Sequence, residues 1–300
     1  MPGTYFGPFN EQYSTYAAET GKNCGRWPLG HRLILPDGRI YRFALNDGTV
    51  EVAGNLYQSI APVTTHAECV VSTVPAIGDT TIAATLGATL AAVDIYSEGI
   101  VHTNKVTGLG YAYRIKRAVS AEAAHAAVDA SGIITVNLAP GEKVQVAGAA
   151  TTEVTFTRNR FHSTIIHPSP PTAMLAGVSP GVCAASRYYW QQVHGEAAVL
   201  ADGTLLVGNM VQASITVDGA VEGQKNRVTA GSTAAADITA FVALEDQDGA
   251  EVALEVGTIA VNAVNDITGP IAGRAPLVGI CTKVNITGEY ALIDLLHLGV

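Results

Sequence analysis

One serine in the chain has the sequence context of a hydrolase nucleophile. Gly177-Val178-Ser179-Pro180-Gly181 matches G-x-S-x-G, in which a serine at a sharp strand-to-helix turn attacks an acyl carbon. The backbone N–H of the following residue normally helps to bind the oxyanion, but Pro180 has no N–H. No helical pattern follows it either. We therefore predict a Gly/Pro turn here, and a hydrolase built on Ser179 ranks last among the functions considered.

Metal chemistry is also weakly supported. Asp246-Gln247-Asp248-Gly249 resembles a calcium loop, with Glu255 where a closing ligand would stand, but Leu244 occupies the first ligand position. A hairpin turn explains this segment better. None of the eight histidines has zinc-ligand spacing, and the four cysteines form no C-x-x-C pair. We predict structural histidines, reduced buried thiols, and no metal or cofactor.

Aromatic side chains are candidates for a different role, that of contacts with a binding partner. The first 25 residues hold five candidate interaction residues: Tyr5, Phe6, Phe9, Tyr13 and Tyr16. They indicate an arm that docks on a partner or, equally well, a strap folded on its own domain, with a short helix over Glu11–Thr20. Tyr188-Tyr189-Trp190 could stack on a sugar or a base, so Trp190 is a sixth candidate, although alternation favours core aromatics on a strand.

The elements that would position these residues are predicted to be strands. Asp-Gly turns separate Arg32–Leu35, Arg39–Leu45 and Thr49–Ala53, which reads as a β-meander. Further strands are predicted every 8–15 residues or so, as in a sandwich or small barrel; Ser120–Val128 suits a short helix or an ordered loop. These later strands are Glu68–Thr73, Thr80–Leu86, Gly99–Asn104, Tyr111–Arg117, Ile133–Leu138, Lys143–Val146, Glu153–Thr157, Tyr188–Val193, Ala197–Leu200, Leu205–Val207, Ser214–Val217, Ile238–Leu244, Val252–Val256, Leu277–Asn285 and Tyr290–Leu298.

The predicted fold class is all-β, with a β-sandwich or barrel body, an inserted second β-domain and an N-terminal arm. The arm is 1–25, and the meander 26–62 pairs with the C-terminal β-domain 169–300. Residues 63–168 form the insertion, which ends at the rigid connector His167–Pro171.

Charge is the most unusual bulk property of this sequence. Only 14% of the 300 residues are charged, against roughly 25% in an ordinary soluble domain. Such a surface suits a protein that is covered by neighbours. The net charge of −9 argues against nucleic acid, since the only basic clusters are Arg114/Lys116/Arg117 and Arg158/Arg160. Charges are sparse over Val63–Ala92 and Val154–Arg187, where we expect subunit contacts.

Neither a secretory signal nor an apolar run of about 18 residues is evident, so we expect a protein made in the cytoplasm, with no membrane partner.

A further group of segments has the loose patterns of β-proteins. The segments are Gly177–Ala185, Tyr188–Gln192 with Gly195 and Ala198–Ala201, Val278-Gly279 with Gly288–Leu295, Tyr96–Gly99, Gly110–Lys116, and Asn159–His162 up to His167-Pro168. Together they resemble virion proteins of tailed bacteriophages, in particular capsid decoration (cement) proteins. The resemblance covers about half of the chain.

The resemblance implies a non-enzymatic β-rich protein on the capsid exterior, often trimeric, with the major capsid protein or other virion proteins as partners. It brings no catalytic residues. The chain is longer than many decoration proteins, which leaves a tail-tube or head-fibre component as an alternative. A carbohydrate-binding adhesin using Tyr189 or Trp190 is another.

Overall fold

The computed structural model describes residues 3–18, 25–118, 128, 131–224, 275–284, 288–296 and 298. Contacts divide the chain into one compact unit, Met1–Gln224 with Ala275–Val300, and a second, Lys225–Arg274. The second unit lies outside the described residues. So do most of the predicted helix Ser120–Val128, the strands Ile238–Leu244 and Val252–Val256, and the turn Asp246–Gly249.

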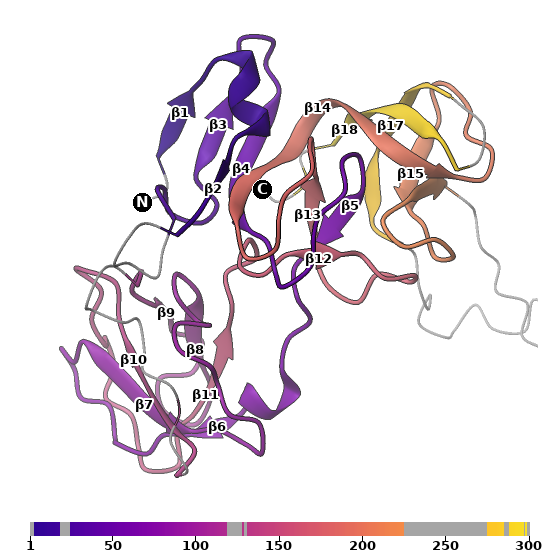
Figure 1. Ribbon diagram of the computed structural model, residues 1–300. Coiled ribbons are helices and arrows are strands. Elements are labelled where there is room, and N and C mark those ends of the chain that lie inside the picture. Colours follow the sequence, from indigo (N-terminus) through magenta and orange to yellow (C-terminus); the bar gives the residue numbers. More distant parts are fainter. Residues whose placement is uncertain are drawn as a thin grey trace, which may run out of the picture. The chain divides into compact units, whose positions relative to one another are not determined.

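The described chain is all-β, as predicted (Figure 1). Its short helices are two 3-10 turns, η1 (Phe9–Tyr13) and η2 (Thr64–His66). The strands are β1 (Thr4–Phe6), β2 (Thr15–Tyr16), β3 (Arg32–Ile34), β4 (Ile40–Leu45), β5 (Leu56–Gln58), β6 (Cys69–Val70), β7 (Thr81–Thr85), β8 (Ile100–Lys105), β9 (Ala112–Arg114), β10 (Ile133–Asn137), β11 (Glu153–Thr157), β12 (Ile165–Ile166), β13 (Leu175–Val178), β14 (Tyr188–Asp202), β15 (Met210–Ala213), β16 (Val221–Gly223), β17 (Leu277–Lys283) and β18 (Tyr290–Leu295).

The long strand β14 organises the largest sheet. Its first half pairs antiparallel with β4, from Tyr188↔Leu45 to His194↔Ile40, and its second half pairs with β18. The register shifts between Gln192 and His194, and Gly195 then takes φ +83°, a conformation that glycine adopts without steric cost. The predicted strands Tyr188–Val193 and Ala197–Leu200 are therefore one strand that changes partner at this bend.

Five strands close into a barrel in the order β14-β16-β15-β17-β18, because β18 pairs back onto β14. The β14–β16 pair is parallel and the other four pairs are antiparallel. The alternating burial along β18, with Ala291, Ile293 and Leu295 inside, is the period-two pattern of a strand with one buried face.

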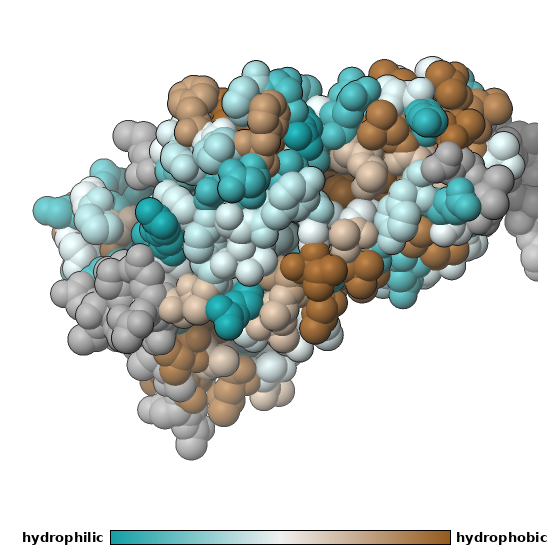
Figure 2. Space-filling view, turned by 45° about the horizontal axis from the view of Figure 1, so that its top comes forward, coloured by the Kyte–Doolittle hydropathy of each residue, from teal (hydrophilic) through white to brown (hydrophobic). Residues whose placement is uncertain are grey.

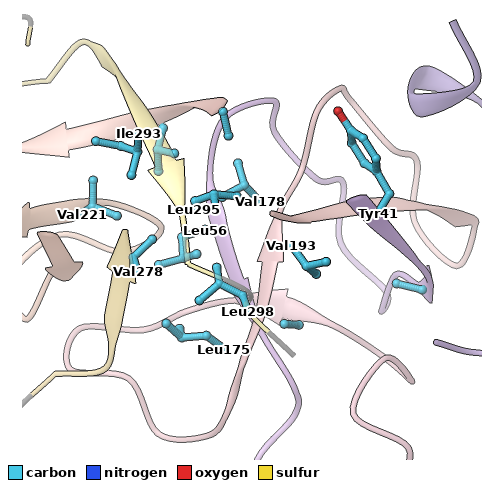
Figure 3. Close-up of a cluster of buried hydrophobic side chains, with 14 of the residues drawn as sticks. Tyr41, Leu56, Leu175, Val178, Val193, Val221, Val278, Ile293, Leu295 and Leu298 are labelled. Carbon is cyan, nitrogen blue, oxygen red and sulfur yellow. The ribbon is translucent and has the colours of Figure 1, made fainter. Parts of the chain in front are cut away.

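The barrel and the sheet around β4 share one hydrophobic core. In Figure 3 the side chains of Leu56, Leu175, Val178, Leu295 and Leu298 meet in the middle of this cluster, so three separate segments of the chain close it. We call it core 1. Its formation depends on pairing between residues that are far apart in the sequence, which is why a local pattern does not reveal it.

A second hydrophobic cluster, core 2, is built from residues 69–156 alone. Strands β6-β11-β8-β9 form one of its sheets, and β7 and β10 form the other. Ile134 and Val136 of β10 face the cluster, as do Tyr113 and Ile115, whereas Tyr111 of the predicted aromatic face is exposed. The domain boundaries at 63 and 168 remain a prediction.

Four predicted strands are wrong. Leu205–Val207 and Ser214–Val217 form turns and loops on either side of β15, and neither is a strand. Thr49–Ala53 contributes only an isolated bridge between Glu51 and Cys183, and Lys143–Val146 has no strand pairing. Val50 and Val52 are exposed, so the apolar residues that suggested a strand do not face a core.

Candidate functional site

The N-terminal segment is tied to the body by backbone pairing. Strand β1 runs parallel to β3, with Thr4 opposite Arg32, and β2 pairs antiparallel with β14, with Tyr16 opposite Tyr188. Between them the chain forms η1 in place of the predicted helix Glu11–Thr20. Of the two readings left open by the sequence, the structure shows the strap folded on its own domain.

Three of the six candidate interaction residues belong to an internal aromatic cluster. Trp190 has 0% of its surface exposed, and its ring centroid lies 5.1 Å from that of Trp27 and 5.0 Å from that of Phe43. Tyr5 and Tyr16 pack against Trp27 at 5.8 and 5.2 Å. Trp190 is therefore corrected from a contact residue to a core residue, because both faces of β14 are covered at this point.

The other three candidates point outward. Phe6 is 76% exposed, Phe9 50% and Tyr13 61%. Large aromatic side chains on an ordered backbone lose little conformational freedom on binding, and they dominate the energetics of protein interfaces. We call Phe6, Phe9 and Tyr13 the aromatic face.

A groove of about 480 Å³ adjoins Tyr13. Its apolar lining includes Val52, Val182 and Tyr290, all of which are exposed, and Val182 is 67% exposed. Tyr13 also reaches across to the turn at Gly181, since a Cβ placed on that glycine would lie 3.5 Å from its ring. The aromatic face therefore continues into an apolar groove.

Gln12, Arg39 and Gln192 line the groove, and the fully buried Tyr41 connects them in a hydrogen-bond network. Arg39 Nη1 donates to Gln12 Oε1 at 3.0 Å, and the Tyr41 hydroxyl lies 2.5 Å from the same oxygen and 3.2 Å from Gln192 Oε1. Burial raises the pKa of the Tyr41 hydroxyl well above its usual range, so it stays protonated. Such a network fixes the shape of the groove and can hydrogen-bond a ligand; the neutral phenol and amides in it are not activated nucleophiles.

Ser179 is among the residues that line the groove. The residue is fully buried, and its Oγ donates to the Gly181 carbonyl at 2.7 Å. The buried carboxyl of Glu51 is close enough for the Ser179 side chain to influence its pKa. The Gly/Pro turn that the sequence predicts is consistent with this geometry, since the hydroxyl closes the turn on itself.

The buried histidines His66 and His167 are hydrogen-bonded structural groups. His167 Nε2 bonds to the Ala220 carbonyl at 2.8 Å, and His66 lies between the Tyr96 hydroxyl and the Thr89 carbonyl. Cys69, Cys183 and Cys281 are free and buried. Within the described ranges, no group of three or more His, Cys, Asp or Glu side chains could hold a metal ion. In the same ranges, no helix is long and apolar enough to cross a bilayer.

Sequence reasoning missed most of this site. Tyr13 was a candidate, but Gln12, Arg39 and Val182 were not. Gln12 and Tyr13 lie in the segment that is held by the pairing of β1 with β3 and of β2 with β14. Arg39 directly precedes β4, and Val182 is next to the bridge between Glu51 and Cys183. Because these residues are far apart in the sequence, no short sequence motif predicts the groove.

Comparison with protein-family models, with curated proteins and with solved structures gives no match for this chain.

Proposed function

We propose that this chain is a non-enzymatic structural protein of a tailed-bacteriophage particle. In this proposal it binds the outer capsid surface as a decoration protein, associates as a trimer and stabilises the shell. The partners are the major capsid protein and further copies of this chain. The sequence resemblance supplies the class of particle, and the aromatic face supplies the means of attachment.

One observation carries the proposal. Phe6, Phe9 and Tyr13 are held outward on a backbone that is fixed by two strand pairings, beside an apolar groove. An exposed, ordered and uncharged surface of this kind is poorly suited to a free monomer, and it can anchor an interface of the standard size of about 1,600 Å². Figure 2 shows apolar residues in brown interrupting the polar surface of the face in view.

The tail-tube or head-fibre role remains the alternative proposal. The adhesin alternative relied on Tyr189 or Trp190 as a stacking platform, and both are buried, at 2% and 0% exposure. No observation now favours it.

The test changes only exposed side chains. In the triple variant Phe6→Ser/Phe9→Ser/Tyr13→Ser, we expect at least a tenfold loss in binding to parent-phage shells stripped of this protein, measured by co-sedimentation. We also expect light scattering to show trimers for the wild type. The matched control is Leu206→Ser/Val207→Ser, because these exposed residues lie between β14 and β15, away from the aromatic face.

A wild-type protein that is a uniform monomer without affinity for shells would overturn the proposal. Rings or filaments in negative-stain micrographs, without shell binding, would support the tail-tube alternative instead.

A further inference from the structure

A second pocket has a different chemistry. It has a volume of about 670 Å³ and shares no lining residue with the groove. Four arginines from β4, β9 and the segment after β11 line it: Arg42, Arg114, Arg158 and Arg160. The two small basic clusters of the sequence thus meet around one cavity, together with an arginine from a third segment. We call it the arginine pocket.

Two carboxylates line this pocket, Glu98 and Glu142. No ion pair joins Glu142 to the arginines of the pocket within the described residues, whereas Glu98 is already paired. Glu98 is buried, and its oxygens lie 3.5 Å from Arg114 and 3.2 Å from Arg117. It also accepts the backbone N–H of Leu29 at 3.1 Å. The negative charge of Glu98 is therefore already paired with Arg114 and Arg117. It does not neutralise the remaining arginines of the pocket.

The other three arginines lack a carboxylate partner among the described residues. Arg42 donates to the Gly30 carbonyl at 3.0 Å, and Arg160 donates to the Leu175 carbonyl at 3.0 and 2.5 Å. A backbone carbonyl accepts a hydrogen bond from a guanidinium group, but it does not neutralise the positive charge of that group. Burial lowers the pKa of all three guanidinium groups, and the pKa of Arg160 is lowered further by the charge of Arg42.

Two of the arginines that line this pocket also carry a nitrogen atom without a hydrogen bond. The Nε atoms of Arg42 and Arg158 are both buried and unpartnered. A buried donor that has lost water costs roughly 1–3 kcal/mol until it finds an acceptor. An anionic ligand in the pocket would supply the missing negative charge, and it could accept hydrogen bonds from the guanidinium nitrogens that face the pocket.

The apolar part of the lining narrows the class of anion. Ile100 is 47% exposed and Met174 62%, and both line the pocket beside the arginines. A guanidinium group matches carboxylates and phosphates alike, but a bare phosphate makes no use of apolar walls. The chain's net charge of −9 disfavours a nucleic-acid backbone.

We propose that the arginine pocket binds an acidic segment of a partner protein, with its carboxylates on Arg42, Arg158 and Arg160 and an apolar side chain on Ile100 and Met174. The site stands apart from the aromatic face, so it does not depend on the decoration role.

The test is fluorescence anisotropy with a labelled eight-residue peptide of alternating Glu and Leu, and with its Gln/Leu counterpart. We expect the full-length protein to bind the Glu/Leu peptide at least tenfold more tightly than the Gln/Leu peptide. Arg158→Gln and Arg42→Gln should each weaken the Glu/Leu peptide about tenfold, as expected for the loss of one charged pair. Lys283→Gln, which removes the same charge from an exposed side chain, should have no effect.

Folding and ligand class are checked separately. Arg158→Lys keeps the positive charge but not the planar guanidinium group, so it should bind the Glu/Leu peptide with intermediate affinity. Thermal unfolding of each variant shows whether it is folded. Equal affinity of wild type and folded arginine variants would overturn the proposal, as would equal affinity for the two peptides. Binding of tripolyphosphate without binding of the Glu/Leu peptide would overturn it in favour of a phosphate site. Shell binding and trimer formation are independent of each of these results.

Discussion

At the scale of single residues, the buried carboxyl of Glu51 is the least expected group. It has no exposed surface; one oxygen accepts from Thr164 Oγ1 at 3.2 Å and the other has no partner. Burial raises the pKa of Glu51 from 4.5 to about 8, and the nearby hydroxyl groups of Tyr189, Thr164 and Ser179 lower it by less. The folded protein therefore keeps this proton at pH values where the unfolded chain has lost it.

Stability should consequently fall as pH rises from 4.5 to about 8, because the unfolded state binds fewer protons there. The slope due to this group is at most about 1.4 kcal/mol per pH unit. We expect Glu51→Gln to remove that slope and to become more stable than the wild type toward pH 8, as measured by urea unfolding. His31 contributes a slope of opposite sign, since burial lowers its pKa, but it is common to both proteins and cancels in the difference.

The exposed Glu289 provides the control for this experiment. If Glu289→Gln changes the pH dependence as much as Glu51→Gln does, the buried carboxyl is not its source.

At the scale of elements, the closest packing lies between β17 and β18. A Cβ on Gly279 would stand 2.2 Å from the Asp294 carbonyl oxygen and 2.8 Å from Ile293 Cγ2. We expect Gly279→Ala to lower the free energy of unfolding by about 1–3 kcal/mol, which is the usual cost of overpacking. The added methyl group would require the backbone of β18 to move. Gly48→Ala is the matched control, since a Cβ there meets nothing within 4 Å. Equal stability of the two variants in urea unfolding would contradict this reading of the barrel.

The same scale shows what periodicity can and cannot predict. Strands such as β10, β11 and β18 were located to within a few residues because one face is buried and the other is not. Strand β13 was missed because Leu175–Val178 is buried on both faces and shows no alternation. The partner exchange along β14 was missed for another reason: pairing with β4 and then with β18 depends on segments about 100–150 residues away, which no local window contains.

At the scale of the whole molecule, two hydrophobic cores coexist in one chain. We expect Ile134→Ala, which removes a fully buried side chain from core 2, to cost about 2–5 kcal/mol locally. Hydrogen exchange should then speed up in β7 and β10 and stay unchanged in β4 and β14. Val199→Ala in core 1 is the reciprocal variant. Acceleration throughout the chain in either variant would mean that the cores unfold as one unit, and that residues 63–168 are not a separate domain.

The closed barrel limits how this protein could polymerise. Each of its five strands already has a barrel strand on both sides, so the barrel offers no open row of N–H and C=O groups to a neighbour. A filament grown by strand addition would have to start elsewhere, for example at β1 on the edge of the large sheet, at β6 or β9 on the edges of the four-stranded sheet, or at β7 or β10 in the two-stranded sheet. Contacts made through the barrel must instead be side chain to side chain, so the number of subunits would be set by surface shape rather than by backbone pairing.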